Sequence, residues 1–401
     1  MLKTLVIYGL PFTMDIVVGL VLFVGRHSLA SRGYGEETIA SIMLGYGIGY
    51  TLSSLLMARI VKPRIARSFM LAALAGTASL CVVLANVDRL IIIQVLYAVF
   101  PLLVSLFFNS CQIYLLGISS EDSRPLAVTA GHFTFSWSLG YALGPFVSSL
   151  AKNTLPWAQI YYLASGVAVA MCALLYAYRP PRTERVLQSA QVQPETPRKQ
   201  LPALVGSAWL GLLVGWTTWG TVLIFWPVQA EALAVPASLR GSMEFISALM
   251  QGLSALALTY VRGWHHKPGW LVVFGGVGLL GLGILSAVEH SLLLVSGALF
   301  FGAYLGSMFS YLVYHAMLDP EKAVRRVAIN ETFVGACFLI ASPLAAVLRR
   351  NGSPFGHSYF GLALMFAAGI AAQALVAQSR MLSRRQTEDR RGQSIRVDPN
   401  S

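Results

Sequence analysis

The stretch "GLPFTMDIVVGL", residues 9–20, places one carboxylate in an apolar segment that carries no other charge between Leu5 and Gly25. A helix rises about 1.5 Å per residue, so this segment is long enough to cross a hydrocarbon core about 30 Å thick. Asp15 is the middle residue of the segment, where lipid cannot solvate a carboxylate. The stretch therefore predicts a membrane-spanning helix whose Asp15 faces protein or a water-filled cavity.

The composition extends this prediction to the whole chain. Of the 401 residues, 56% are hydrophobic and only 11% are charged, and the mean hydropathy is +0.65. A soluble domain carries about 25% charged residues. The composition thus indicates a membrane protein and excludes a disordered chain or a large soluble core.

Apolar segments long enough to span a bilayer recur twelve times, six on each side of a proline-rich, basic stretch at residues 179–200. The predicted spans are 5–26, 37–59, 65–87, 90–118, 125–151, 157–178, 203–226, 239–261, 269–288, 291–318, 324–348 and 357–379. We expect an all-α membrane protein with twelve transmembrane helices. Its parts are a six-helix bundle (1–178), a linker (179–200), a second six-helix bundle (201–379) and a disordered tail (380–401).

The basic residues divide unevenly between the two sides of these spans. Of the 29 Lys and Arg residues, all but seven lie on the side of the N-terminus. The seven are Arg26, Arg32, Arg89, Lys152, Arg240, Arg349 and Arg350. The positive-inside rule then predicts a protein of the cell (inner or plasma) membrane with both termini and the linker in the cytoplasm. Topology explains the net charge of +12 without a nucleic-acid partner.

The two halves also resemble each other in sequence. At an offset of 198 residues, "TAGHFTFSWSLGYALGPFVSSL" (129–150) aligns with "VAINETFVGACFLIASPLAAVL" (327–348). The identical pairs are Ala130 with Ala328, Thr134 with Thr332, Phe135 with Phe333, Pro145 with Pro343 and Leu150 with Leu348. Because these segments are the fifth and eleventh predicted spans, the match favours two pseudo-symmetric halves.

This organisation resembles the major facilitator superfamily of secondary transporters. On the fifth span, Gly140, Gly144 and Pro145 match the superfamily's G-x-x-x-G-P signature. In the loop after the second span, Arg59 and Lys62 match basic positions of a second motif. The resemblance implies alternating access, a solute site at the midplane between the halves, and gating roles for these five residues.

The chain departs from the superfamily's patterns at several positions. Ser148 and Ser149 stand where a glycine pair should follow the signature, and Gln94 replaces the arginine typical of drug antiporters. The second motif has Ser54, Ala58 and Val61 in place of Gly, Asp and Gly.

Two carboxylates inside predicted spans are the first candidates for the solute and proton site. Asp15 lies on a polar face of the first span, and Glu244 begins the longest polar stripe, which continues through Ser247, Gln251 and Ser254. We interpret both carboxylates as midplane groups that face the cavity, because intramembrane ionisable residues usually mark a pathway. Each could hold a proton or a cationic group of the solute.

The remaining candidates have alternatives of equal or greater weight. His132 could relay protons or simply donate one hydrogen bond, and Glu331 could bind solute or pair with Arg325 or Arg326. Trp216 and Trp219 could stack on a ring-bearing solute or pack between helices. Gln251, Asn109 and Gln112 complete the set, although interhelical hydrogen bonding is the more frequent use of such side chains.

The sequence contains no nucleotide-binding loop, nucleophile–base arrangement or metal-ligand set. The four cysteines occur singly in apolar segments, which argues against disulfides and metal sites. We therefore expect a monomer that is not an enzyme and has no cofactor, with a small solute, protons and the bilayer as its partners.

The most favoured function is secondary active transport of a small organic solute, with export coupled to proton entry. Proton-coupled uptake is the first alternative. The second is a receptor or assembly subunit that has a transporter's fold but transports nothing, which the altered second motif keeps open.

Overall fold

The computed structural model describes residues 2–119, 126–177, 204–261, 263–287 and 290–396. Within these ranges the chain is almost entirely helical, with short turns between helices. The long helices are α1 (Leu2–Ser31), α2 (Glu36–Ile60), α3 (Pro63–Ala85), α4 (Leu90–Ser119), α5 (Leu126–Ala151), α6 (Trp157–Ala177), α8 (Val205–Ala232), α9 (Ser242–Leu258), α10 (Gly269–Ala287), α11 (Ser291–Met317), α12 (Pro320–Leu348) and α13 (Phe355–Arg396). The expected all-α fold with twelve transmembrane helices is confirmed.

Ten of these helices are long and apolar enough to cross a membrane by length and composition alone, and α5 and α9 are the two others. Helix α9 has only 17 residues, and α5 carries His132, Ser136 and Ser138 along its length. These two helices pack against each other at the boundary between the halves. A helix covered by protein on several sides needs less apolar surface than one exposed to lipid.

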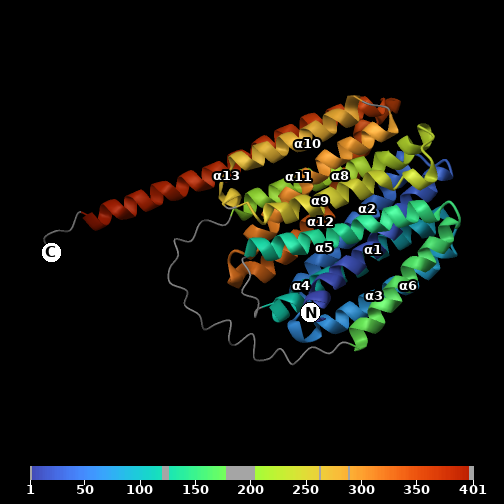
Figure 1. Cartoon of the computed structure of the whole chain (residues 1–401), viewed down its shortest axis with the longest axis horizontal. Coiled ribbons are helices and arrows are strands. Elements are labelled where there is room, and N and C mark those ends of the chain that lie inside the picture. The colour runs from blue at the N-terminus through green and yellow to red at the C-terminus, as the bar shows by residue number, and fades with distance from the viewer. Residues whose placement is uncertain (1, 120–125, 178–203, 262, 288–289, 397–401) are drawn as a thin grey trace.

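Helices α1–α6 form one half of the molecule and α8–α13 form the other, as Figure 1 shows from blue to red. The halves meet mainly through two helix pairs, α2 with α12 and α5 with α9. Because the chain crosses twelve times, Leu2 and Arg396 lie on the same side of the bundle. We call this the near side and the opposite one the far side.

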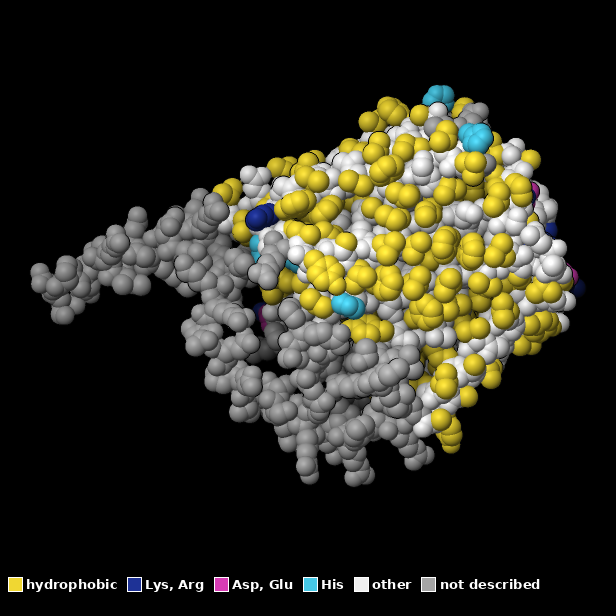
Figure 2. Space-filling view, in the orientation of Figure 1, with side chains coloured by type: hydrophobic (Ala, Val, Ile, Leu, Met, Phe, Trp, Pro, Cys, Tyr) yellow, Lys and Arg dark blue, Asp and Glu magenta, His cyan; other side chains and the backbone are white. Residues whose placement is uncertain are grey.

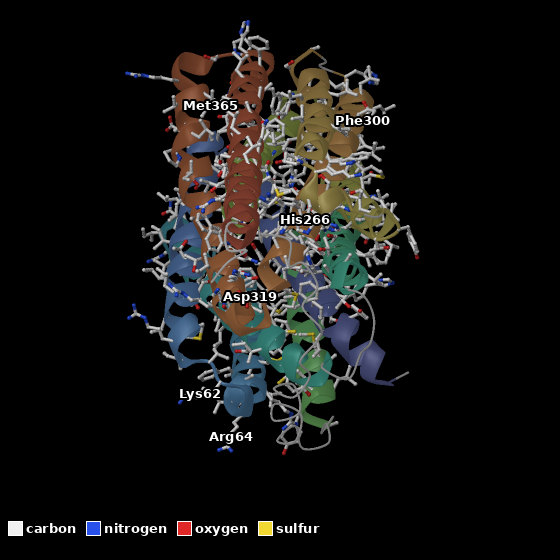
Figure 3. All side chains as sticks on the ribbon, turned by 90° about the vertical axis from the view of Figure 1, so that its left-hand side faces the viewer. Lys62, Arg64, His266, Phe300, Asp319 and Met365 are labelled. Atoms are coloured by element: carbon white, nitrogen blue, oxygen red, sulfur yellow. The ribbon has the colours of Figure 1, made fainter. Side chains whose placement is uncertain are left out.

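The lateral surface of the bundle is suited to lipid. Apolar side chains cover the face seen in Figure 2, and Lys, Arg, Asp and Glu are confined to its two ends. Met365 of α13, which is labelled in Figure 3, is 51% exposed. Lys62 lies instead in the turn between α2 and α3 at the near side, and Arg64 lies in the first turn of α3. Exposed apolar surface of this extent marks the hydrocarbon-facing belt of a membrane protein.

Two predicted boundaries need correction. Helix α1 continues to Ser31 instead of ending at residue 26, so Arg26 and His27 are buried helical residues. Helix α13 continues to Arg396, although a disordered tail was expected from residue 380. Residues 380–396 contain six Arg and two Gln, which are residue types of high helix propensity. The predicted linker, residues 179–200, lies outside the described residues.

Candidate functional site

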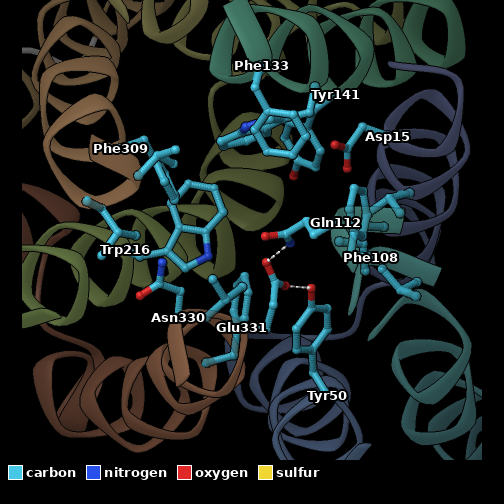
Figure 4. A pocket seen from close by; sticks show the side chains of 18 of the residues that line it. Asp15, Tyr50, Phe108, Gln112, Phe133, Tyr141, Trp216, Phe309, Asn330 and Glu331 are labelled. Atoms are coloured by element: carbon cyan, nitrogen blue, oxygen red, sulfur yellow. Dashed lines mark hydrogen bonds between the residues drawn. The ribbon is translucent and has the colours of Figure 1, made fainter. Parts of the chain in front are cut away.

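A cavity lies between the two halves and is lined by α1, α2, α4 and α5 from the first half and by α8, α11 and α12 from the second. Its volume is about 890 Å³, including the part that is open to solvent. Figure 4 shows aromatic rings around its walls and two carboxylates, Asp15 and Glu331, on its polar side.

Asp15 comes from α1 and points into the cavity (Figure 4). Its side chain is only 7% exposed, and none of the described residues donates a hydrogen bond to it. Two glycines of α5 determine how closely α1 approaches, because a Cβ at Gly140 would collide with the backbone of Phe12 and a Cβ at Gly144 with that of Gly19. The predicted glycine motif thus holds the backbone on both sides of Asp15.

Glu331 comes from α12 and is held by partners from the other half. The Tyr50 hydroxyl of α2 donates to Oε2, and the Gln112 amide of α4 donates to Oε1 at 2.6 Å. The alternative pairing of Glu331 with Arg325 or Arg326 is wrong. Arg326 lies 3.6 Å from the carboxylate of Asp319 at the near-side end of α12, because it sits more than a turn closer to that end than Glu331.

Glu244 does not line the cavity, and its predicted midplane position is wrong. Helix α9 begins only at Ser242, so Glu244 occupies its first turn near the far side. There its Oε2 accepts a hydrogen bond from Arg26 Nη2 of α1 at 2.7 Å, and neither side chain is exposed. His27 Nε2 lies 3.8 Å from Oε1, and the Tyr141 hydroxyl donates to Oε2 at 3.4 Å.

Two further polar links join the halves at the far side. Ser149 of α5 accepts a hydrogen bond from the backbone N–H of Gly241 at 3.0 Å and donates to the carbonyl of Ala237. Arg349, at the end of α12, pairs with Glu36 at the start of α2 at 2.7 Å. Ser149 is one of the serines that depart from the superfamily's glycine pair, and the structure shows a use for its hydroxyl. Together with Arg26–Glu244 these contacts join the two halves at the far side.

The other predicted site residues divide between the cavity wall and helix packing. Gln112 and Trp216 line the cavity. Gln251 donates to Ser138 across the α9–α5 contact, His132 Nδ1 contacts the carbonyl of Val128, Asn109 donates to Ser105, and Trp219 stacks on Phe301. Arg59 and Lys62 are exposed at the near-side end of α2, and Pro145 contacts Gly241 at the far side.

Arg26 is the most informative residue that the sequence prediction missed. The predicted span, residues 5–26, ended at Arg26, and Arg26 was counted among the basic residues at the far side. No Gly or Pro follows Arg26 until Gly33. This absence of helix-breaking residues could have indicated that the helix continues past residue 26. The sequence did not identify Trp137 and Phe309 as residues of the cavity wall. Apolar residues that face a cavity and those that pack between helices follow the same sequence pattern.

Comparison with known proteins agrees with this geometry. The family model described as Major Facilitator Superfamily matches residues 5–342. No curated protein is significantly similar to the chain in sequence. Among solved structures, a variant of the nucleoside transporter NupG has a TM-score of 0.66 at 11% identity, covering 94% of this chain and 99% of that one.

The human organic anion transporter MFSD10 (TETRAN) has a TM-score of 0.65 at 13% identity, covering 92% of this chain and 98% of that one. At such identities the structural matches show a shared fold alone. The family match, however, extends over most of the chain and both of its halves. The protein is therefore a member of the major facilitator superfamily, a secondary transporter and not an enzyme.

Proposed function

We propose that this transporter exports a small organic solute in exchange for protons, by alternating access at the cavity between its halves. The observation that carries the proposal is Asp15, a buried carboxylate that points into this cavity and receives no hydrogen bond from the described residues. A carboxylate in that position can bind a proton in one conformation and release it in another, which gives the differential affinity that coupling requires.

The far-side contacts bear on the conformational change that alternating access requires. Arg26–Glu244, the Ser149 hydrogen bonds and Arg349–Glu36 all join one half to the other, so opening the far side requires all of them to separate. The near side carries most of the basic residues of the chain, so we assign it to the cytoplasm. In this state the cavity would receive its solute from the cytoplasm, as an exporter requires.

The test is solute-driven proton movement in proteoliposomes that contain a trapped pH indicator. Cationic, neutral and anionic aromatic solutes are added in turn, and at least one should move protons faster than in empty liposomes. Asp15→Asn should abolish this movement, because the amide keeps the shape of the side chain but binds no proton. Asp88→Asn is the matched control, since the Asp88 side chain is 93% exposed.

Two results would contradict the proposal. Unchanged proton movement in both Asp15→Asn and Glu331→Gln would show that coupling does not use the cavity carboxylates. Solute binding without any movement of solute or protons would support the receptor alternative instead.

A further inference from the structure

The charged residues that line the cavity are all acidic. Its nineteen lining residues include two carboxylates, Asp15 and Glu331, but no Lys, Arg or His. Glu331 has both oxygens occupied by Tyr50 and Gln112, whereas Asp15 has no donor among the described residues. The wall therefore contains one carboxylate that is free to bind a ligand and a second that adds negative charge.

Among the described residues, neither the arginine of α1 nor those of α12 compensates this charge. Arg26 lies three turns beyond Asp15 on α1, about 16 Å along the helix axis, and its own partner is Glu244. On α12, Arg326 faces Asp319 at the near-side end, and Arg325 is exposed. An anionic ligand would thus meet two carboxylates at low dielectric without a counter-charge, which is strongly unfavourable.

Aromatic rings form most of the rest of the wall. Nine of the nineteen lining residues are aromatic: Tyr46, Tyr50, Phe108, Phe133, Trp137, Tyr141, Trp216, Phe309 and Phe338. Phe309 meets both Trp137 and Trp216 edge-on, with ring centroids 4.8 and 5.3 Å apart. The negative faces of such rings attract a cation, and their breadth suits a flat, apolar body.

We infer that the solute is a monovalent organic cation with a flat aromatic or apolar body, whose charged group is bound by Asp15. This inference rests on the proposed function, because it names the substrate class of the same cavity. The rings of the wall would hold the apolar body, and Glu331 would raise the local cation concentration without contacting the charged group.

Three probes of similar shape isolate the effect of charge. They are N-methyl-4-phenylpyridinium (a cation), 4-phenylpyridine (neutral at mildly alkaline pH) and biphenyl-4-carboxylate (an anion). Binding to the purified full-length protein in detergent is measured by equilibrium dialysis. The cation should bind at least about tenfold more tightly than either other probe, as a desolvated cation–π and carboxylate contact predicts.

Substitutions then assign the preference to a residue. Asp15→Asn should remove most of the preference for the cation, Glu331→Gln should reduce it less, and Asp88→Asn should leave it unchanged. Thermal melting of each variant establishes that it is folded, and Glu331→Gln keeps the test valid should Asp15→Asn not fold. Equal binding of the three probes, tighter binding of the anion, or a preference that survives both cavity substitutions would overturn the inference.

Binding in detergent requires no transport, so this result is separable from that of the proposed function. Cation-selective binding without proton movement in liposomes would support the ligand class and reject the transport cycle. Proton movement driven only by neutral or anionic solutes would support the transport cycle and reject the ligand class.

Discussion

Arg26 of α1 and Glu244 of α9 form an ion pair between the two halves, 2.7 Å from Nη2 to Oε2, with no exposure of either side chain. Each residue comes from a different half, and the pair lies beyond the cavity on the far side. The two charges neutralise each other only while the halves are together on this side. The pair thus couples the stability of the closed far side to the relative position of α1 and α9.

Removal of one partner should destabilise the protein more than removal of both. Arg26→Ala or Glu244→Ala leaves a buried charge unpaired, which should lower the free energy of unfolding by about 3–5 kcal/mol. The double variant should recover part of this loss. Thermal or denaturant unfolding in detergent measures the effect, and equal stability of single variants and wild type would contradict it.

Loss of the pair should also open the far side. A cysteine introduced as Leu22→Cys, at the cavity wall, should react slowly with a membrane-impermeant thiol reagent added from the far side. Combined with Glu244→Gln, the same cysteine should react several-fold faster. An unchanged rate would show that the other far-side contacts suffice for closure.

The close approach of α1 to α5 should not tolerate an added methyl group at Gly140. Because its Cβ would collide with the backbone of Phe12, Gly140→Ala should lower stability by about 1–3 kcal/mol and displace Asp15 enough to impair transport. Gly166→Ala on α6 is the matched control, since a Cβ there meets nothing within 4 Å. Comparable melting temperatures for the two variants would argue against this role of Gly140.

The hydroxyl of Tyr50 should matter more than that of Tyr46. Tyr50 donates to Glu331, whereas the Tyr46 hydroxyl makes no hydrogen bond with the described residues, although both line the cavity. Tyr50→Phe should lower stability by about 1.5–3 kcal/mol, the range for a hydrogen bond to a charged group, and slow transport. Tyr46→Phe should change neither by much, and similar losses in both would refute the assignment.

The predicted orientation can be tested at two exposed turns. In intact cells, Asp88→Cys should react with an impermeant thiol reagent, whereas Lys62→Cys should react only after the cells are opened. Of the native cysteines, Cys81, Cys111 and Cys337 are buried, and the partly buried Cys172 is replaced by serine in the labelled variants. The opposite labelling pattern would place the termini outside and reverse the inferred direction of transport.

The sequence by itself determined the class and order of the spans. Hydropathy and charge are properties of each segment alone. They therefore predicted twelve spans in two halves, and an Asp15 that must avoid lipid, without knowledge of which helices pack together. The functional role of Asp15 stays a prediction.

Only the tertiary structure decided which polar groups meet. Glu244 and Arg26 are 218 positions apart in the chain, and Glu331 and Gln112 are 219 apart. Each contact depends on where a helix begins and how it is rotated against a helix of the other half. Those two quantities arise from close packing between the halves, as at Gly335 of α12, where a Cβ would collide with Thr51 of α2, and from the exact start of α9. A local pattern of apolar residues carries no information about either.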